Sequence, residues 1–165
     1  MDRHFLQVRA NYCVPACIVM VEAWRGTLSA PPDERQHEIF DQLAVNGLCA
    51  LEDAARLLPH EGVGEPDIDP AHQAVFLGQR ITAGRRAIVT CRPGLLGQIL
   101  APRKLSSPHG TLTGNTPHHA IYVFGAEQGH FDVYDPWHFT AGQPLRLSRA
   151  QLARAWTGMM LIATK

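Results

Sequence analysis

The chain has 165 residues, of which 45% are hydrophobic and 18% are charged. This composition excludes a disordered chain, and the length is typical of one globular domain, so we expect a single domain over residues 1–165. Fifteen Lys and Arg residues balance fifteen Asp and Glu residues without a basic run, which gives no electrostatic reason to expect nucleic acid as a partner.

The N-terminal residues and the cysteines bear on where the protein works. The first ten residues, MDRHFLQVRA, are too polar for a signal peptide, and no apolar run is long enough for a membrane span. The four cysteines, at positions 13, 17, 49 and 91, form no C-x-x-C pair and no disulfide framework, which favours a reducing compartment. We therefore expect a cytoplasmic protein, or one exported without a cleavable signal peptide.

The first half of the chain has mostly helical patterns. Val14, Cys17, Ile18 and Val21 share one helical face, which predicts a helix that begins at Cys13 and stops at Arg25-Gly26. Three more helices are expected, and the residues between the last two form a loop. The predictions are a helix capped at Ser29 and ended by Gly47, one from about Ala50 to Leu58, a loop from Pro59 to Asp69, and a helix from Asp69-Pro70 to Gly84.

The second half of the chain has the β-branched and alternating patterns of strands. Strands are predicted at 87–91, 118–124, 130–137, 143–147 and 158–164, and a capping box at Ser148 opens one helix that runs to Trp156. Arg92 to Pro117 is predicted as a long loop, and Arg103, Lys104 and His109 in it are candidates for specificity. Helices followed by strands indicate an α+β fold with a cleft between its layers.

Cys13 lies at the predicted N-terminus of the first helix. The helix dipole favours a negative charge there, which lowers the pKa of a thiol and makes it a better nucleophile. Gln7 lies six residues upstream, and its amide can donate a hydrogen bond to a developing oxyanion together with the Cys13 backbone N–H. The alternative interpretation is that Cys13 and Cys17 are small, buried core residues.

The two central strands indicate a partner for this thiol. A hairpin closed by Gly125 to Gly129 places His119 directly opposite Asp135 on the apolar, core-facing side, whereas His118 points to the other side. A carboxylate beside a histidine fixes its tautomer and stabilises the imidazolium, so this pair is a candidate general base with its orienting residue for Cys13. The alternative is a cross-strand pair that serves only solubility or strand register, and a slip of one residue would break the pairing.

These motifs resemble those of papain-like cysteine peptidases, closest to the double-glycine leader peptidase domains attached to bacteriocin-exporting ABC transporters. Those domains open with Gln, five residues and Cys-Gly-Pro-Ala, and this chain has Gln7 followed by Cys13-Val14-Pro15-Ala16. They continue with a His-apolar run ending in Gly and a strand ending in Asp-Pro, as at 119–125 and 133–136 here. They close with a Trp-containing helix and a final strand, to which residues 147–164 are similar.

The resemblance implies a papain-like α+β fold in which a helical N-terminal part packs on an antiparallel β-sheet C-terminal part. It implies Cys13 as nucleophile, His119 as general base and acid, Asp135 as the orienting residue and Gln7 in the oxyanion hole, with no cofactor and no metal. Val14 stands where those domains have glycine. A β-branched side chain at this position narrows the cleft, changes the substrate or marks a domain that no longer cuts.

The predicted function is hydrolysis of a peptide or amide bond in a peptide or protein substrate, through an acyl-thioester intermediate. The same triad supports glutamine deamidation or acyl transfer to an amine, as in toxin or effector modules. Two alternatives are a non-catalytic peptide-binding module of papain-like fold and a metal-binding protein that uses His109, His118, His119 and His130. The sequence leaves the oligomeric state open.

Overall fold

The computed structural model describes residues 1–64, 68, 70–116 and 118–165. Its centre is a six-stranded antiparallel sheet in the order β1-β6-β2-β3-β4-β5. The strands are β1 (His60–Gly64), β2 (Arg86–Cys91), β3 (His119–Glu127), β4 (His130–Tyr134), β5 (Leu145–Ser148) and β6 (Trp156–Ala163).

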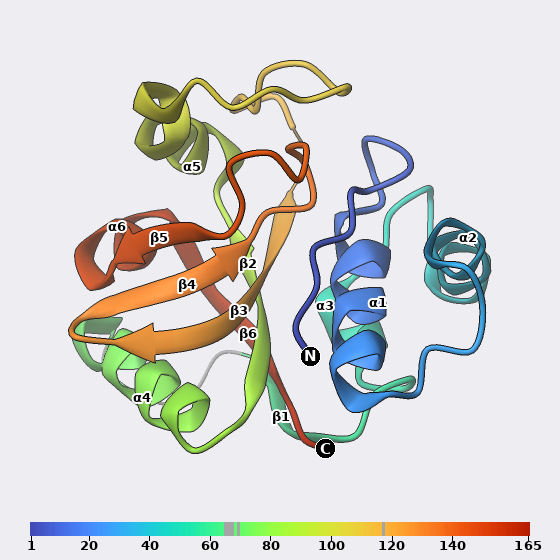
Figure 1. Cartoon of the computed structure of the whole chain (residues 1–165), viewed down its shortest axis with the longest axis horizontal. Coiled ribbons are helices and arrows are strands. Elements are labelled where there is room, and N and C mark those ends of the chain that lie inside the picture. Colours follow the sequence, from blue (N-terminus) through green and yellow to red (C-terminus); the bar gives the residue numbers. More distant parts are fainter. Residues whose placement is uncertain (65–67, 69, 117) are drawn as a thin grey trace.

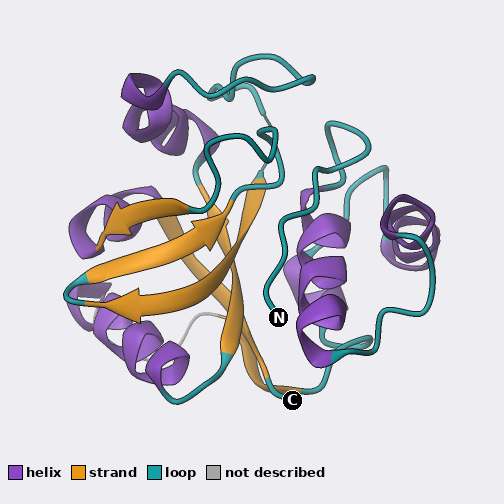
Figure 2. Ribbon diagram, viewed as in Figure 1, coloured by secondary structure: helices purple, strands orange, loops and turns teal. Residues whose placement is uncertain are grey.

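Helices cover both faces of this sheet (Figure 1). The N-terminal helices α1 (Cys13–Arg25), α2 (Pro32–Leu43) and α3 (Leu51–Ala54) lie on one side. The other side carries α4 (Pro70–Thr82), α5 (Pro93–Leu100) and α6 (Arg149–Ala155), and a 3-10 turn (Ala101–Arg103) follows α5. The predicted α+β fold, with a helical N-terminal part against an antiparallel sheet, is confirmed, and Figure 2 shows the two kinds of element side by side.

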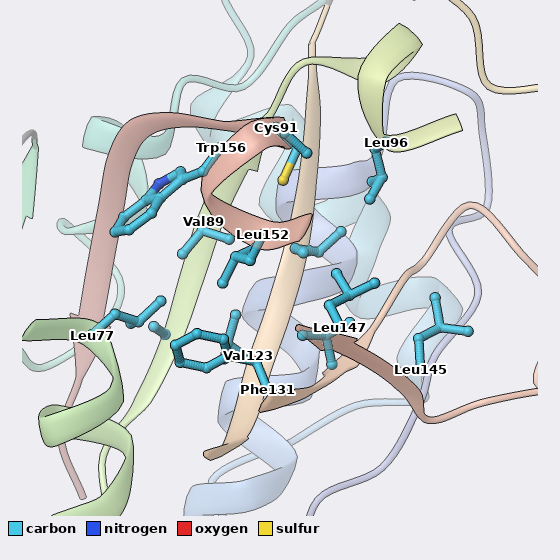
Figure 3. Close-up of a cluster of buried hydrophobic side chains, with 14 of the residues drawn as sticks. Leu77, Val89, Cys91, Leu96, Val123, Phe131, Leu145, Leu147, Leu152 and Trp156 are labelled. Carbon is cyan, nitrogen blue, oxygen red and sulfur yellow. The ribbon is translucent and has the colours of Figure 1, made fainter. Parts of the chain in front are cut away.

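Each face of the sheet buries its own apolar core. Because alternate residues of a strand point to opposite faces, Ile88 and Tyr122 pack with α1, whereas Val89 and Val123 pack on the other side. Figure 3 shows this second core, in which Leu77 of α4 and Leu152 of α6 pack with Phe131 of the sheet. Burying one such side chain stabilises the fold by roughly 1.5–3 kcal/mol, so both faces anchor the central strands.

The first helix begins and ends as predicted. Its first residue is Cys13, and Gly26 after its last residue has a left-handed φ of 76° and donates to the carbonyl oxygens of Ala23 and Glu22. The helix is buried along nearly its whole length, because the sheet packs on one side of it and α2 on another. This packing fixes the position of its N-terminal residue.

Two predicted loops contain regular structure. β1 lies within the predicted loop 59–69, and its mostly exposed residues show no apolar alternation that would mark a strand. α5 lies within the predicted loop 92–117, where two glycines weaken the helical pattern. A Cβ at Gly97 would collide with the carbonyl oxygen of Leu112, so glycine permits the later part of this segment to pack closely on the helix.

Several predicted helix ends are shifted. α2 begins at Pro32 with Pro31 as its N-cap, so the predicted cap at Ser29 is wrong, and the helix ends well before Gly47 because Ala44 is extended. α3 is shorter than predicted and does not reach Leu58. The predicted cap at Asp69 lies outside the described residues.

The capping box that opens α6 is confirmed. The Gln151 N–H donates to Ser148 Oγ over 3.1 Å, and Gln151 Oε1 accepts from the Ser148 N–H over 2.8 Å. The helix ends at Ala155, and β6 begins at Trp156. No helix in the described part of the chain is long and apolar enough to cross a membrane.

The prediction that the hairpin places His119 directly opposite Asp135 is wrong. The turn is shorter than assumed, because Gln128-Gly129 takes left-handed φ values of 49° and 76°. These values suit a two-residue hairpin turn whose twist matches the strands. β3 therefore extends to Glu127, which pairs with His130.

A β-bulge between Val123 and Gly125 changes the register again, and Val123 then pairs with Val133. This partner lies two residues further along β4 than the predicted one. Since side chains alternate with a period of two, a shift of two residues leaves every side chain on its predicted face. His119 and Asp135 therefore remain on one side of the sheet although they are not paired directly.

Candidate active site

Cys13 is the first residue of α1, so its thiol lies at the positive end of the helix dipole. A turn in which the Tyr12 N–H donates to the Arg9 carbonyl oxygen over 3.0 Å leads into the helix. Cys13 is 2% exposed, and its Sγ lies 4.0 Å from the carbonyl oxygen of His118, just before β3. The N-terminus of α1 lies beside the start of β3, the strand that carries His119 (Figure 1).

His119 and Asp135 form a buried pair. His119 Nε2 lies 2.7 Å from Asp135 Oδ1, and the two residues are 1% and 0% exposed. The other ring nitrogen, Nδ1, is buried and has no hydrogen-bond partner among the described residues. Burial is the largest influence on the ring and lowers its pKa, but Asp135 and then Cys13 outweigh it and raise the pKa of His119 to about 10. Asp135 therefore occupies one ring nitrogen, and the other is not hydrogen-bonded within the described part of the chain.

Asp135 is fixed by hydrogen bonds to its carboxylate and to its backbone. The Trp137 N–H donates to Oδ1 over 3.0 Å, and His138 Nδ1 lies 2.8 Å from Oδ2. The Gln143 amide bonds to both the backbone N–H and the carbonyl oxygen, over 3.2 and 3.0 Å, and His4 Nε2 lies 3.0 Å from the same oxygen. Burial raises the pKa of the Asp135 carboxyl, but the two histidines outweigh it and hold the pKa well below its usual range.

Sequence reasoning missed three of these neighbours: His138, Gln143 and His4. The turn after Asp135 returns a histidine three residues later to the carboxylate, and this spacing is a local signal that could have been used. Gln143 and His4 reach the backbone of Asp135 from a loop and from the N-terminal segment. Their contacts depend on tertiary packing, which no local pattern marks.

Gln7 is also buried, with 1% of its surface exposed. Its Nε2 donates to the Arg9 carbonyl oxygen over 2.7 Å, while its Oε1 is buried without a hydrogen-bond partner in the described part of the chain. Its backbone N–H donates to the Pro136 carbonyl oxygen over 2.9 Å, and its carbonyl oxygen lies 2.9 Å from His109 Nε2. The amide nitrogen carries two hydrogens, so one remains after the bond to Arg9.

A cavity of about 400 Å³ lies beside these residues. Asn11 lines it two residues before Cys13, and Trp137 lines it with a ring centred 6.0 Å from the His119 ring. The remaining lining comes from Ala10 and from the segment before β3: His109, Thr111, Thr113, Asn115 and Thr116. No carboxylate, lysine or arginine occurs among the described residues that form this wall.

Three neighbours of the candidate nucleophile point elsewhere. Val14 is buried in the core that α1 forms with the sheet, so its side chain does not line the cavity. Cys17 lies in the same core, and burial raises the pKa of its thiol. Burial lowers the pKa of His118, because it disfavours the charged ring, and this ring contacts the Cys49 backbone rather than Asp135.

The metal-binding alternative has no matching cluster. Among residues 1–64, 68, 70–116 and 118–165, no group of three or more His, Cys, Asp or Glu side chains is arranged to hold a metal ion. The four cysteines are free and buried.

Solved structures share this fold. The peptidase domain of Streptococcus ComA, a bi-functional ABC transporter involved in a quorum-sensing pathway, has a TM-score of 0.50 and 13% identity over 98% of this chain and 97% of that one. A C39-like peptidase from Bacillus anthracis has a TM-score of 0.61 and 12% identity over 98% of this chain and 94% of that one. No protein-family model matches the sequence, and neither does any curated protein. The resemblance to papain-like peptidases is thus confirmed at the level of the fold.

Proposed function

We propose that the protein is a cysteine hydrolase that cleaves a peptide or amide bond, with Cys13 as nucleophile. His119 is the proposed general base and acid, and Asp135 the residue that orients it. The observation that carries the proposal is the state of the His119 ring. The Asp135 carboxylate binds Nε2, and Nδ1, buried and unbonded within the described residues, is left for the thiol at the head of α1.

In the first step the thiol proton passes to His119 Nδ1. The pKa of His119 is raised to about 10, so the ring keeps this proton at neutral pH while the sulfur attacks the substrate carbonyl carbon. A C–S bond forms, and the carbonyl oxygen becomes an oxyanion. This oxyanion accepts hydrogen bonds from the Cys13 backbone N–H and from the second N–H of the Gln7 amide.

In the second step His119 donates its proton to the leaving nitrogen, and the C–N bond breaks to leave a thioester on Cys13. A water molecule then loses a proton to His119 and attacks the thioester carbonyl, which releases the acid product and the thiolate. Asp135 stays ionised throughout, because its pKa lies well below the usual range, and it stabilises the imidazolium at each stage.

The cavity beside Trp137 is the proposed entrance for a peptide or protein substrate. Cys13 is nearly buried, so the substrate displaces side chains at this mouth, such as His109 and Trp137, before its carbonyl carbon reaches the sulfur. The uncharged wall suits a segment without charged side chains next to the scissile bond.

The same burial favours one alternative, a papain-like module that binds a peptide without cutting it. Alkylation by iodoacetamide at pH 6 separates the two. If the protein is a hydrolase, iodoacetamide labels Cys13 stoichiometrically at this pH, and His119→Ala removes that reactivity. Slow labelling of Cys13 that increases only near pH 8.5, as for an ordinary thiol, would favour the binding module.

A second experiment identifies the reaction. Protein is incubated with a cell lysate, and Cys13→Ala protein serves as the control. New peptide termini that depend on Cys13 support a peptidase, conversion of Gln to Glu supports a deamidase, and new amide linkages support a transferase. If Cys13 is reactive but the lysate shows none of these changes, the result would contradict both hydrolysis and acyl transfer.

A further inference from the structure

Gln36 is a polar residue of α2 with an exposed fraction of 0%. A buried amide needs hydrogen-bond partners, because its removal from water is otherwise costly. Gln36 Oε1 accepts from the Val8 N–H over 3.0 Å, and its Nε2 donates to the Leu6 carbonyl oxygen over 3.0 Å. One side chain of α2 therefore binds the backbone on both sides of Gln7. We call these two bonds the Gln36 clamp.

The backbone groups of Gln7 itself have other partners. Its N–H donates to the Pro136 carbonyl oxygen over 2.9 Å, and its carbonyl oxygen lies 2.9 Å from His109 Nε2. This alternation of partners from one residue to the next is the pattern of a strand that lies between two neighbouring strands. Residues 6–8 belong to no helix or strand, so the Gln36 clamp takes the place of one missing neighbour.

The side chain of Gln7 is tied to the start of α1. Gln7 Nε2 and the Tyr12 N–H both donate to the Arg9 carbonyl oxygen, over 2.7 and 3.0 Å. Tyr12 directly precedes Cys13, and its ring stacks on Phe40 of α2 with the ring centroids 4.3 Å apart. α2 therefore holds both the backbone around Gln7 and the turn that leads to Cys13.

We propose that Gln36 is a positioning residue of the candidate active site, which fixes the Gln7 amide for its hydrogen bond to the oxyanion. This inference rests on the proposed function, in which Gln7 stabilises that oxyanion. The stabilisation depends on a donor that is in place before the charge develops. Because the segment that carries Gln7 lies outside regular secondary structure, the Gln36 clamp supplies the rigidity that a helix or strand gives elsewhere. Gln36 acts through Gln7 and transfers no proton.

Two reagents separate this role from a general effect on the fold. The ester p-nitrophenyl acetate acylates the Cys13 thiolate: the sulfur attacks the ester carbonyl through a tetrahedral oxyanion, a C–S bond forms, the C–O bond breaks and p-nitrophenolate leaves. Iodoacetamide alkylates the same sulfur by displacing iodide, and no oxyanion forms. Both rates are measured on the whole protein, and Cys13→Ala protein gives the background. The ratio of acylation to alkylation therefore reports the oxyanion donors, whereas a change in thiolate content alters both rates.

Variants of α2 test the clamp. Gln36→Met keeps the length of the side chain but removes both bonds, so acylation should slow at least about tenfold and alkylation less than about twofold. Gln36→Asn keeps an amide that is one methylene too short to reach Leu6 and Val8 together, and its acylation should slow at least about threefold. A wild-type ratio in these variants would overturn the proposal, and Gln36→Asn decides if Gln36→Met does not fold.

Ile39→Val is the matched control on the same helix. It removes one methylene from a side chain that is buried in the core and makes no contact in the clamp. The melting temperature should fall by about 2–4 °C, while both rates stay within about twofold of wild type. A ratio that falls as far in this variant as in Gln36→Met would mean that any loss of stability in α2 has the same effect, and it would overturn the positioning role.

The route through Gln7 is tested with a double variant. If Gln36 acts by positioning Gln7, the ratio in Gln7→Ala/Gln36→Met should equal that in Gln7→Ala within about twofold, and losses that multiply would overturn the proposal. A low ratio in Gln7→Ala with a wild-type ratio in Gln36→Met rejects Gln36 alone and leaves the proposed function in place. A wild-type ratio in Gln7→Ala rejects the oxyanion role of Gln7 and the positioning role with it.

Failure of the proposed function has a different signature. Cys13 that reacts with neither reagent in wild type contradicts a nucleophilic role for this thiol. The side-chain amide resonances of Gln7 then test the Gln36 clamp independently of reactivity. They should move in Gln36→Met and stay in place in Ile39→Val, and resonances that do not move in Gln36→Met would overturn the clamp.

Discussion

Cys13 and Asp135 lie on opposite sides of the candidate site, and different forces hold them. Cys13 is positioned by the apolar packing of α1, and its sulfur lies 4.0 Å from the carbonyl oxygen of His118, a weak contact. Asp135 is positioned by hydrogen bonds to its carboxylate and its backbone, from side chains of several segments and from the Trp137 backbone N–H. The comparison indicates that the nucleophile can be changed with little loss of stability, whereas the carboxylate supports catalysis and the fold together.

The largest effect is expected for Cys13→Ala, because it removes the atom that attacks the substrate. Turnover should fall by at least about 10⁴-fold, while thermal unfolding changes little. Cys17→Ala is the matched control one helical turn later. It should keep turnover and lose roughly 1 kcal/mol of unfolding free energy, since it leaves a small cavity in the core. Loss of activity in the Cys17 variant instead would show that the nucleophile is assigned wrongly.

Asp135→Asn should lower both activity and stability. The amide keeps the shape of the carboxylate but removes the charge that two histidines bind. We expect turnover to fall by about 10³–10⁴-fold and the unfolding free energy by about 3 kcal/mol, because a buried charged network is left incomplete. Steady-state kinetics and denaturant titration measure the two losses. Activity within tenfold of wild type would contradict the orienting role of this residue.

Gln7→Ala tests the oxyanion contact on the Cys13 side. Removing one oxyanion donor lowers turnover by about 10²–10³-fold, but alkylation of the thiol forms no oxyanion. The variant should therefore lose turnover and keep the wild-type rate of iodoacetamide labelling. A parallel loss of both would show that Gln7 positions Cys13 rather than the substrate oxygen.

The His119–Asp135 pair should also give stability a defined pH dependence. The pKa of His119 is raised to about 10 in the fold, so its contribution is complete below the unfolded value near 6.5 and is lost as the pH rises from there to about 10. The pKa of Asp135 is lowered, so its contribution is present above about pH 4 and is lost as the pH falls below that. Melting temperatures between pH 6 and 10 should decline in wild type and much less in His119→Gln, and equal declines would contradict the assignment.

The residues of the site differ in how far sequence could predict them. The start of α1 at Cys13 follows from local periodicity and its end from Gly26, and both are properties of a short segment. The contact of His119 with Asp135 was predicted with an incorrect register, because a left-handed Gln128 and a β-bulge are not visible in the residue pattern. The side-chain faces were still correct, since the error was two residues. His4 and Gln143 meet Asp135 only through tertiary packing, which the sequence pattern does not specify.

The smallest effect is expected for His118→Ala, which sharpens the comparison between the two adjacent histidines. The His118 ring contacts the Cys49 backbone, and burial lowers its pKa, so it stays neutral at neutral pH and away from Asp135. Only its backbone carbonyl approaches Cys13, and alanine keeps that group. The kcat/KM of His118→Ala should stay within about threefold of wild type, whereas His119→Ala should lose nearly all turnover. If the His118 variant were the inactive one, the general base would lie on the α3 side of β3, and the role of Asp135 would have to be reassigned with it.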